Sequence, residues 1–226
     1  MRLQTILGMA LCFVLPASLW AKSYDDMAVK ALDGTIMVQH ADNSQPVALQ
    51  TDSIMEKGDT ITVYDQSWLI LKSRKGDLIG LDGYNGSTVM IIEECFTEGP
   101  DRQFRLILKQ GSLILKTNGC DSRQSFFEIN SGSFVTSVNN VRAILTYTPA
   151  QSLLKTQYLR GKMSVIDKNT EHRMTLEHTE NHWQNGLMVD EKTQLMDETD
   201  VVNFDRFFDG KSRLTPPDNN ILLRAN

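Results

Sequence analysis

The sequence predicts an all-β protein, built as antiparallel packed sheets or as a short β-roll or sandwich, with a short C-terminal helix. Three observations support this fold class. From Thr35 to Asp167, apolar residues alternate with polar ones or form short β-branched runs, which is typical of half-buried strands. Gly, Asp, Asn and Ser interrupt these runs at short intervals, as turns do. A clear helical spacing of apolar residues occurs only between residues 197 and 210.

The first 21 residues have the composition of a secretory signal peptide. Arg2 precedes an apolar run from Ile6 to Leu15, which is followed by Pro16 and by small residues up to Ala21. This order predicts cleavage after Ala21 and a periplasmic or secreted mature protein. The run is shorter than a comfortable membrane span, so we expect no stable transmembrane anchor. The alternative is an uncleaved N-terminal anchor.

The expected strands lie in residues 22–196, which we treat as one domain because a chain of 226 residues can bury a sizeable core. Each strand is bounded by turn residues. The expected strand segments are 34–40, 59–65, 67–73, 77–81, 87–92, 104–109, 112–116, 134–138, 142–148 and 162–167.

A unit of apolar strand, glycine and second apolar strand occurs several times, with its glycines at Gly76, Gly111 and Gly161. The intervals between these glycines differ, so the unit is not a repeat of fixed period. A turn that needs a positive φ angle accepts few residues other than glycine. We therefore expect each of these glycines in a turn between two strands.

Residues 197–226 are expected to form a short helix followed by a flexible tail. Val201, Phe204 and Phe208 are spaced as on one face of a helix, and Gly210 is suited to its end. We expect this aromatic face to pack on the sheet, because apolar residues at this spacing usually belong to a core. The alternative is an aromatic ligand-binding box.

Charge and cysteine content limit the partners and the compartment. The net charge is −5, which gives no basic surface for nucleic acid. Loss of the signal peptide leaves Cys95 and Cys120, an even pair that favours a disulfide in an exported protein. Such a bond stabilises the fold by roughly 3 kcal/mol through loop closure. The alternative is two separate buried thiols.

The stretch EHTENHWQNG contains the candidate metal ligands His178, Glu180 and His182. In an extended chain these three residues share one face, where they could bind a metal together. A zinc-protease helix requires glutamate directly after the first histidine, and this chain has threonine there. The alternative is a strand that ends in a hairpin turn at Asn185-Gly186 and returns through LMVDE, because Asn-Gly is a strong hairpin signal.

No motif for catalysis or cofactor binding is found: the chain lacks a nucleophile elbow, a phosphate-binding loop and a dinucleotide fingerprint, and His40 stands alone in an extended segment. We expect a protein that is not an enzyme and has no cofactor. Trp68, Tyr84 and Trp183 lie near polar turns, as does Tyr64, where aromatic rings can contact a sugar or a partner side chain. For Trp68 the alternative is a core position.

The order of strands and glycines between residues 31 and 190 resembles the FecR-like domain family, named for the periplasmic part of a bacterial iron-uptake regulator. The matching features are Gly34, Gly58-Asp59, Gly76-Asp77, Asp82-Gly83, Leu106-Leu108-Gly111 and Leu159-Gly161. The resemblance implies an exported β domain that binds or scaffolds an envelope protein or glycan.

Regulators of this family also carry a sigma-factor-binding region before a membrane helix and a further periplasmic domain. The sequence shows none of these parts, so we do not expect regulator status to apply. The expected function is a non-catalytic binding or scaffolding module of the bacterial envelope. The alternative is a periplasmic metal-binding or sensor-accessory protein that uses the histidine-rich turn.

Overall fold

The computed structural model describes residues 27–43, 45–84, 86–98, 101–119, 125–171, 173–177, 182–184, 187–190, 204 and 206–209. Within these ranges, strands account for most of the chain, which confirms the all-β class. No helix in this described part is long and apolar enough to span a membrane. The expected signal peptide, residues 1–21, lies outside it.

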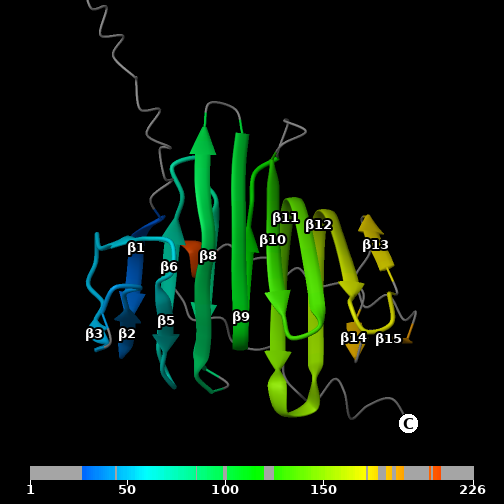
Figure 1. The fold of residues 1–226 in the computed structure, drawn as a ribbon, viewed down its shortest axis with the longest axis horizontal. Helices are drawn as coiled ribbons and strands as arrows, with labels where there is room; N and C mark the ends of the chain where they lie inside the picture. The colour runs from blue at the N-terminus through cyan, green and yellow to red at the C-terminus, as the bar shows by residue number, and fades with distance from the viewer. Residues whose placement is uncertain are drawn as a thin grey trace, which may run out of the picture.

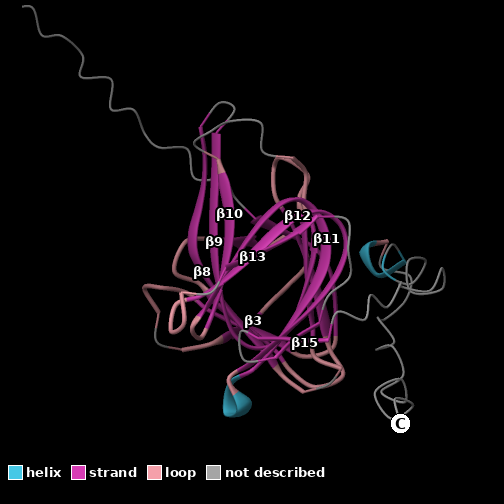
Figure 2. Ribbon diagram, turned by 90° about the vertical axis from the view of Figure 1, so that its right-hand side faces the viewer, coloured by secondary structure: helices cyan, strands magenta, loops and turns pink. Residues whose placement is uncertain are grey.

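Thirteen strands form one hydrogen-bonded sheet, which curls around its core (Figures 1 and 2). A separate two-stranded hairpin follows it. The thirteen strands are β1 (Met27–Asp33), β2 (Ile36–Gln39), β3 (Val47–Ala48), β4 (Ile54–Met55), β5 (Thr60–Val63), β6 (Trp68–Lys72), β7 (Leu78–Asp82), β8 (Thr88–Glu98), β9 (Asp101–Lys116), β10 (Phe126–Ser131), β11 (Phe134–Thr148), β12 (Leu153–Asp167) and β13 (Arg173–Glu177). A 3-10 turn, η1 (Pro149–Gln151), joins β11 to β12.

The curled sheet has two walls that share three long strands. Wall 1 consists of β3, β2, β5, β8, the first half of β9, β10, the first half of β11, the second half of β12 and β13. Wall 2 consists of β4, β1, β6, β7 and the remaining halves of β9, β11 and β12. Each of β9, β11 and β12 therefore passes from one wall to the other.

The core lies between the walls and is formed by alternate residues of each strand. Burial alternates residue by residue in β10, and in β11 on either side of Asn140, as the sequence pattern predicts. Leu69 and Leu81 of wall 2 and Leu106 and Ile129 of wall 1 are fully buried in this cluster.

The glycine prediction is correct in conformation but only partly in location. Gly76 has a φ of 85° and lies in the hairpin turn between β6 and β7, as expected. Gly111 and Gly161 also have positive φ angles, 89° and 106°, but each lies inside a continuous strand. At Gly111 strand β9 exchanges its partners β8 and β10 for β7 and β11. The expected turns at these two glycines are therefore corners where a strand passes between walls.

One strand pair departs from the expected antiparallel pattern. Strand β10 runs parallel to β9, with Phe127 opposite Phe104. The reason lies in the two-wall arrangement: β9 ends at Lys116 in wall 2, whereas β10 begins at Phe126 in wall 1, beside Gln103 near the start of β9. The chain thus returns to the beginning of β9 before it continues.

A short helical turn near the C-terminus covers the outer face of wall 2, as expected. Phe204 and residues 206–208 are helical, and Phe204, Phe207 and Phe208 are at most 1% exposed. They form a second apolar cluster with Ile70 and Ile114, separate from the main core. This supports the core interpretation of the aromatic spacing rather than a ligand-binding box.

Two Lys-Gly-Asp triplets, 57–59 and 75–77, each lie at a turn. Both glycines have positive φ angles, and both aspartates are almost fully buried. Asp59 Oδ2 accepts a hydrogen bond from the Glu56 N–H at 2.9 Å. Asp77 accepts one from the Ser73 hydroxyl at 3.0 Å and one from the Asn118 N–H at 2.8 Å. Each buried carboxylate thereby holds its turn in place.

Candidate functional site

Three neighbouring turns at one end of the molecule present two exposed tyrosines, and we call this region the tyrosine end. It consists of residues 33–35, 64–67 and 82–84 with 86–87. These turns follow β1, β5 and β7 respectively. Tyr64 is 47% exposed and Tyr84 is 39% exposed.

Backbone hydrogen bonds join the three turns. The N–H of Tyr64 donates to the Thr35 carbonyl at 3.1 Å, and the N–H of Gly83 donates to the Ser67 carbonyl at 2.9 Å. The Ser67 hydroxyl accepts from the Thr35 N–H at 2.8 Å. These bonds link turns that lie far apart in the sequence, such as those of Thr35 and Ser67. These hydrogen bonds fix the three turns relative to one another, so the tyrosine end is a structurally defined surface.

Two glycines allow this close approach. A Cβ atom at Gly83 would lie 2.0 Å from the Tyr64 carbonyl oxygen, and one at Gly34 would lie 2.3 Å from the Ser67 hydroxyl oxygen. Tyr84 is fixed on the other side of Gly83, because its N–H donates to Asp82 Oδ1 at 3.1 Å. The backbone positions of both tyrosines are thus set by close packing.

Exposed tyrosines on a fixed backbone are suited to binding. A tyrosine ring supplies a large contact area at a low cost in side-chain entropy, and its hydroxyl can donate or accept a hydrogen bond. The exposed carboxylate of Asp65 lies next to Tyr64 in the same turn. This combination of aromatic rings and polar groups can contact a protein side chain or the apolar face and hydroxyls of a sugar.

The other predicted aromatic contacts lie elsewhere. Trp68 begins β6 and is half-buried, with its ring 5.9 Å from that of Phe207 in an edge-on contact. Trp183 lies in β14 (His182–Gln184). Of the three predicted ligand contacts, Tyr84 is therefore the one in the tyrosine end, where it is joined by Tyr64.

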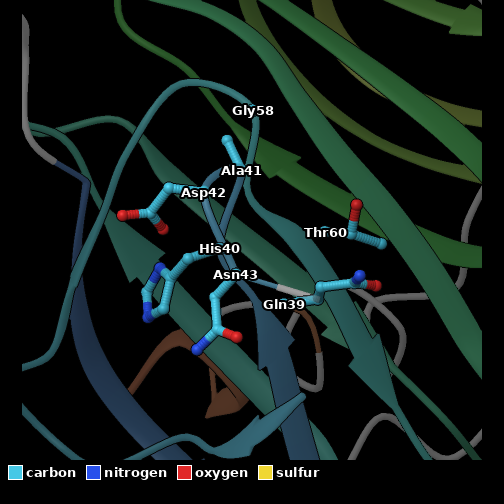
Figure 3. A pocket seen from close by; sticks show the side chains of 7 residues that line it. All are labelled: Gln39, His40, Ala41, Asp42, Asn43, Gly58 and Thr60. Atoms are coloured by element: carbon cyan, nitrogen blue, oxygen red, sulfur yellow. The ribbon is translucent and has the colours of Figure 1, made fainter. Parts of the chain in front are cut away.

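A second feature is a polar hollow between the turn at residues 39–43 and the turn at residues 56–60 (Figure 3). Its most defined group is His40, whose Nδ1 lies 3.0 Å from Asp59 Oδ1. Asp59 is 2% exposed, whereas His40 is 39% exposed. The two atoms are within hydrogen-bond distance, and Nδ1 is the donor in the tautomer that carries its hydrogen there. His40, which stands alone in the sequence, is thus positioned by Asp59 of the first Lys-Gly-Asp triplet.

The histidine-rich stretch contains a hairpin. Strand β14 pairs antiparallel with β15 (Leu187–Asp190), and Gln184 lies opposite Leu187, which agrees with the predicted return strand; the predicted turn residues Asn185 and Gly186 lie outside the described residues. His182 lies in β14, while His178 and Glu180 are outside the described residues. Among the residues that the structure describes, no three His, Cys, Asp or Glu side chains are grouped so that they could bind a metal. The metal site stays a prediction.

The cysteine pair is also only partly covered. Cys95 is buried in β8 and belongs to the main core. Cys120 lies outside the described ranges. The disulfide between them remains a sequence prediction.

Comparison with known proteins gives limited information. No known protein family matches the chain, and no curated protein matches it. Two crystal structures, at 1.65 and 2.50 Å resolution, of a protein from Parabacteroides distasonis ATCC 8503 described as a "putative anti-sigma factor" are similar in structure. In both cases the TM-score is 0.47 and the sequence identity 15%, over 65% of this chain and 64% of the other. This chain therefore spans about two thirds of those chains.

The arrangement of the tyrosine end was not visible in the sequence. Tyr64 and Tyr84 are twenty residues apart and belong to different turns. The available signals were Gly34 and the Asp82-Gly83 step, which mark turns. They do not reveal that the turns meet, because that contact depends on the pairing of β6 with both β1 and β7.

Proposed function

We propose that this chain is an exported, non-catalytic binding or scaffolding module of the bacterial envelope, of FecR-like type. Two lines of reasoning support the proposal. The order of strands and turns resembles the FecR-like family, and the first 21 residues have the pattern of a signal peptide. The partner is an envelope protein or glycan.

The observation on which the proposal chiefly rests is the tyrosine end. Tyrosine is enriched at interface positions that contribute most to affinity. Tyr64 and Tyr84 are exposed on turns that hydrogen bonds and close-packed glycines hold fixed. A fixed surface loses little conformational entropy when a partner binds. We expect the partner to contact both rings at once.

Photo-crosslinking in the native host tests this proposal. A photoreactive phenylalanine analogue is placed at Tyr64 or at Tyr84 in the full-length chain, and envelope fractions are analysed after irradiation. We expect one dominant crosslinked protein, or a glycan adduct, at both positions. In a second experiment the probe is placed at Gln66, in the same turn as Tyr64. The same adduct should form there with both tyrosines present, and should decrease at least tenfold in the Tyr64→Ala, Tyr84→Ala double variant.

Ile54 supplies the matched control. It is 52% exposed, but it pairs with Ala28, whereas the tyrosine end begins at Asp33 at the other end of β1. A probe at Ile54 should not yield the same adduct. If all positions give the same adducts, or if the two tyrosine positions give none, the tyrosine end is not the binding surface.

A further inference from the structure

An apolar row crosses five strands on the outer face of wall 2, and we call it the groove because Gly80 leaves space in it. Cross-strand pairing places Ala31, Ile70, Gly80, Ile114 and Ile144 in a single row. Ile70 and Ile114 are fully buried although they point away from the main core. Strand β6 and the wall 2 half of β9 accordingly read Leu-Ile-Leu, because both of their faces are covered there.

A glycine forms the deepest point of this groove. A Cβ atom at Gly80 would lie 2.3 Å from the ring of Phe207 and 3.2 Å from the Cβ of Ile114. The missing side chain thus leaves a notch that the Phe207 ring fills. Trp68 borders the notch, in edge-on contact with that ring. The rings of Phe204 and Phe208 pack edge-on against each other, with centroids 5.2 Å apart, and close the groove.

Lysines mark one side of the groove and fix the direction of the bound helix. The Lys30 ammonium donates to the Phe208 carbonyl at 2.6 Å, and the Lys116 ammonium lies 6.0 Å from the centroid of the Phe208 ring. The last carbonyls of a helix have no partner within the helix and are favourable neighbours for cations. The groove therefore recognises both an aromatic pattern, Phe-x-x-Phe-Phe, and the C-terminal end of the helix that bears it.

The docked helical turn is short, and the thirteen residues before it lie outside the described ranges. Residues 191–203 separate β15 from Phe204, and thirteen residues span at most about 47 Å when extended. A radius of gyration of about 17 Å is expected for a domain of this size. The connection can thus bring the helix to the groove of its own chain or of a neighbouring one. Both arrangements make the same contacts, so the exchange costs little.

From this geometry we infer that the groove also binds the C-terminal helix of a second copy of this chain, which gives a swapped dimer. The notch at Gly80, the row of isoleucines and the lysines receive Phe204, Phe207 and Phe208 in either arrangement. In the monomer the chain's own helix competes for the groove. Dimers are therefore expected to form at high protein concentration.

Two full-length variants test the groove and the helix individually. In the acceptor, Phe204, Phe207 and Phe208 are all replaced by alanine, so the groove is open and the helix cannot dock. In the donor, Gly80→Val fills the notch and leaves the helix intact. Each variant alone should be monomeric by analytical ultracentrifugation. An equimolar mixture should form a heterodimer at least about tenfold tighter than the wild-type dimer, because no helix competes in cis.

Controls address folding and alternative occupants. Near-UV circular dichroism checks that both variants fold. A milder pair uses Phe207→Ala as the acceptor and Gly80→Ala as the donor. A labelled peptide of residues 197–212 is titrated onto the acceptor. Peptide binding without a donor–acceptor heterodimer would show that the groove accepts helices but not a second copy, which contradicts the inference. If the acceptor binds neither the peptide nor the donor, the helix only covers its own sheet, and this result would also overturn the inference.

Discussion

At the scale of single residues, buried aspartates explain why the Lys-Gly-Asp triplets are found where they are. The sequence predicted turns there from the glycines and the aspartates that follow them. The structure adds that Asp77 reaches across to the N–H of Asn118, more than forty residues away, and that Asp59 positions His40. Such partners cannot be predicted from one sequence, because they depend on which turns meet in space.

We predict that Asp77→Ala destabilises the fold by about 2–4 kcal/mol, since removal of the carboxylate leaves buried N–H and hydroxyl groups without their acceptor. Urea unfolding followed by tryptophan fluorescence measures the change. Asp42→Ala, at an exposed position, is the control and should change the free energy of unfolding by less than about 0.5 kcal/mol. Equal effects would contradict the role assigned to Asp77.

A second prediction at this scale concerns Asp167 at the end of β12. Burial favours the neutral carboxyl, but hydrogen bonds from the Asn169 N–H and from the hydroxyls of Ser133 and Thr170 outweigh it, so the pKa of Asp167 is lowered. The unfolded chain therefore binds a proton at higher pH than the folded chain does, and ionised Asp167 stabilises the fold.

We expect this stabilisation to be present above the ordinary aspartate pKa of about 3.9 and to be lost as pH falls through the lowered pKa. Asp167→Asn should accordingly be less stable than wild type at pH 7, and the difference should shrink in acid. Thermal unfolding between pH 7 and pH 2 measures it. A difference that does not change with pH would show that the charge is not responsible.

At the scale of elements, the sequence predicted most strands and the aromatic face of the helix, because alternation and helical spacing are local patterns. It did not distinguish a hairpin turn from a corner. Gly76 and Gly161 both have positive φ angles, but only at Gly76 does the chain reverse. The difference is set by the strands alongside: Gly161 lies against the backbone of Asn140 at the register shift between β11 and β12.

We predict that Gly161→Ala is strongly destabilising, by about 3 kcal/mol or more, because strain at positive φ is combined with a steric clash. A Cβ atom there would lie 2.1 Å from the Asn140 carbonyl oxygen. Gly86 is the matched control: its φ is 110°, and nothing lies within 4 Å of the added atom. Gly86→Ala should show only the cost of strain, about 1 kcal/mol. Thermal unfolding of both variants compares the two costs.

At the scale of the whole molecule, the all-β class and the C-terminal helix followed from the sequence, whereas the two-wall arrangement did not. Alternation shows which residues face inward, but not that β9, β11 and β12 each serve two walls. The tyrosine end shows the same limit, since its parts come from three turns that only the pairing of β6 brings together.

The predicted disulfide is tested on the intact protein. Mass spectrometry of the mature chain without reduction should show the loss of two hydrogens, which reappear on reduction. Reduction should lower the free energy of unfolding by roughly 3 kcal/mol, because the bond closes a loop between Cys95 and Cys120. Two thiols that react with an alkylating reagent in the unreduced, unfolded chain would show that the bond is absent.

The three strands that pass between the walls also determine when this chain can fold. Wall 1 and wall 2 both need β12, which ends at Asp167, so an N-terminal fragment leaves each wall with unpaired edges. Folding that depends on such distant pairings is slow. For the exported protein that we propose, we expect this delay to keep the chain unfolded during translocation, because neither wall can be completed until the chain through Asp167 is available.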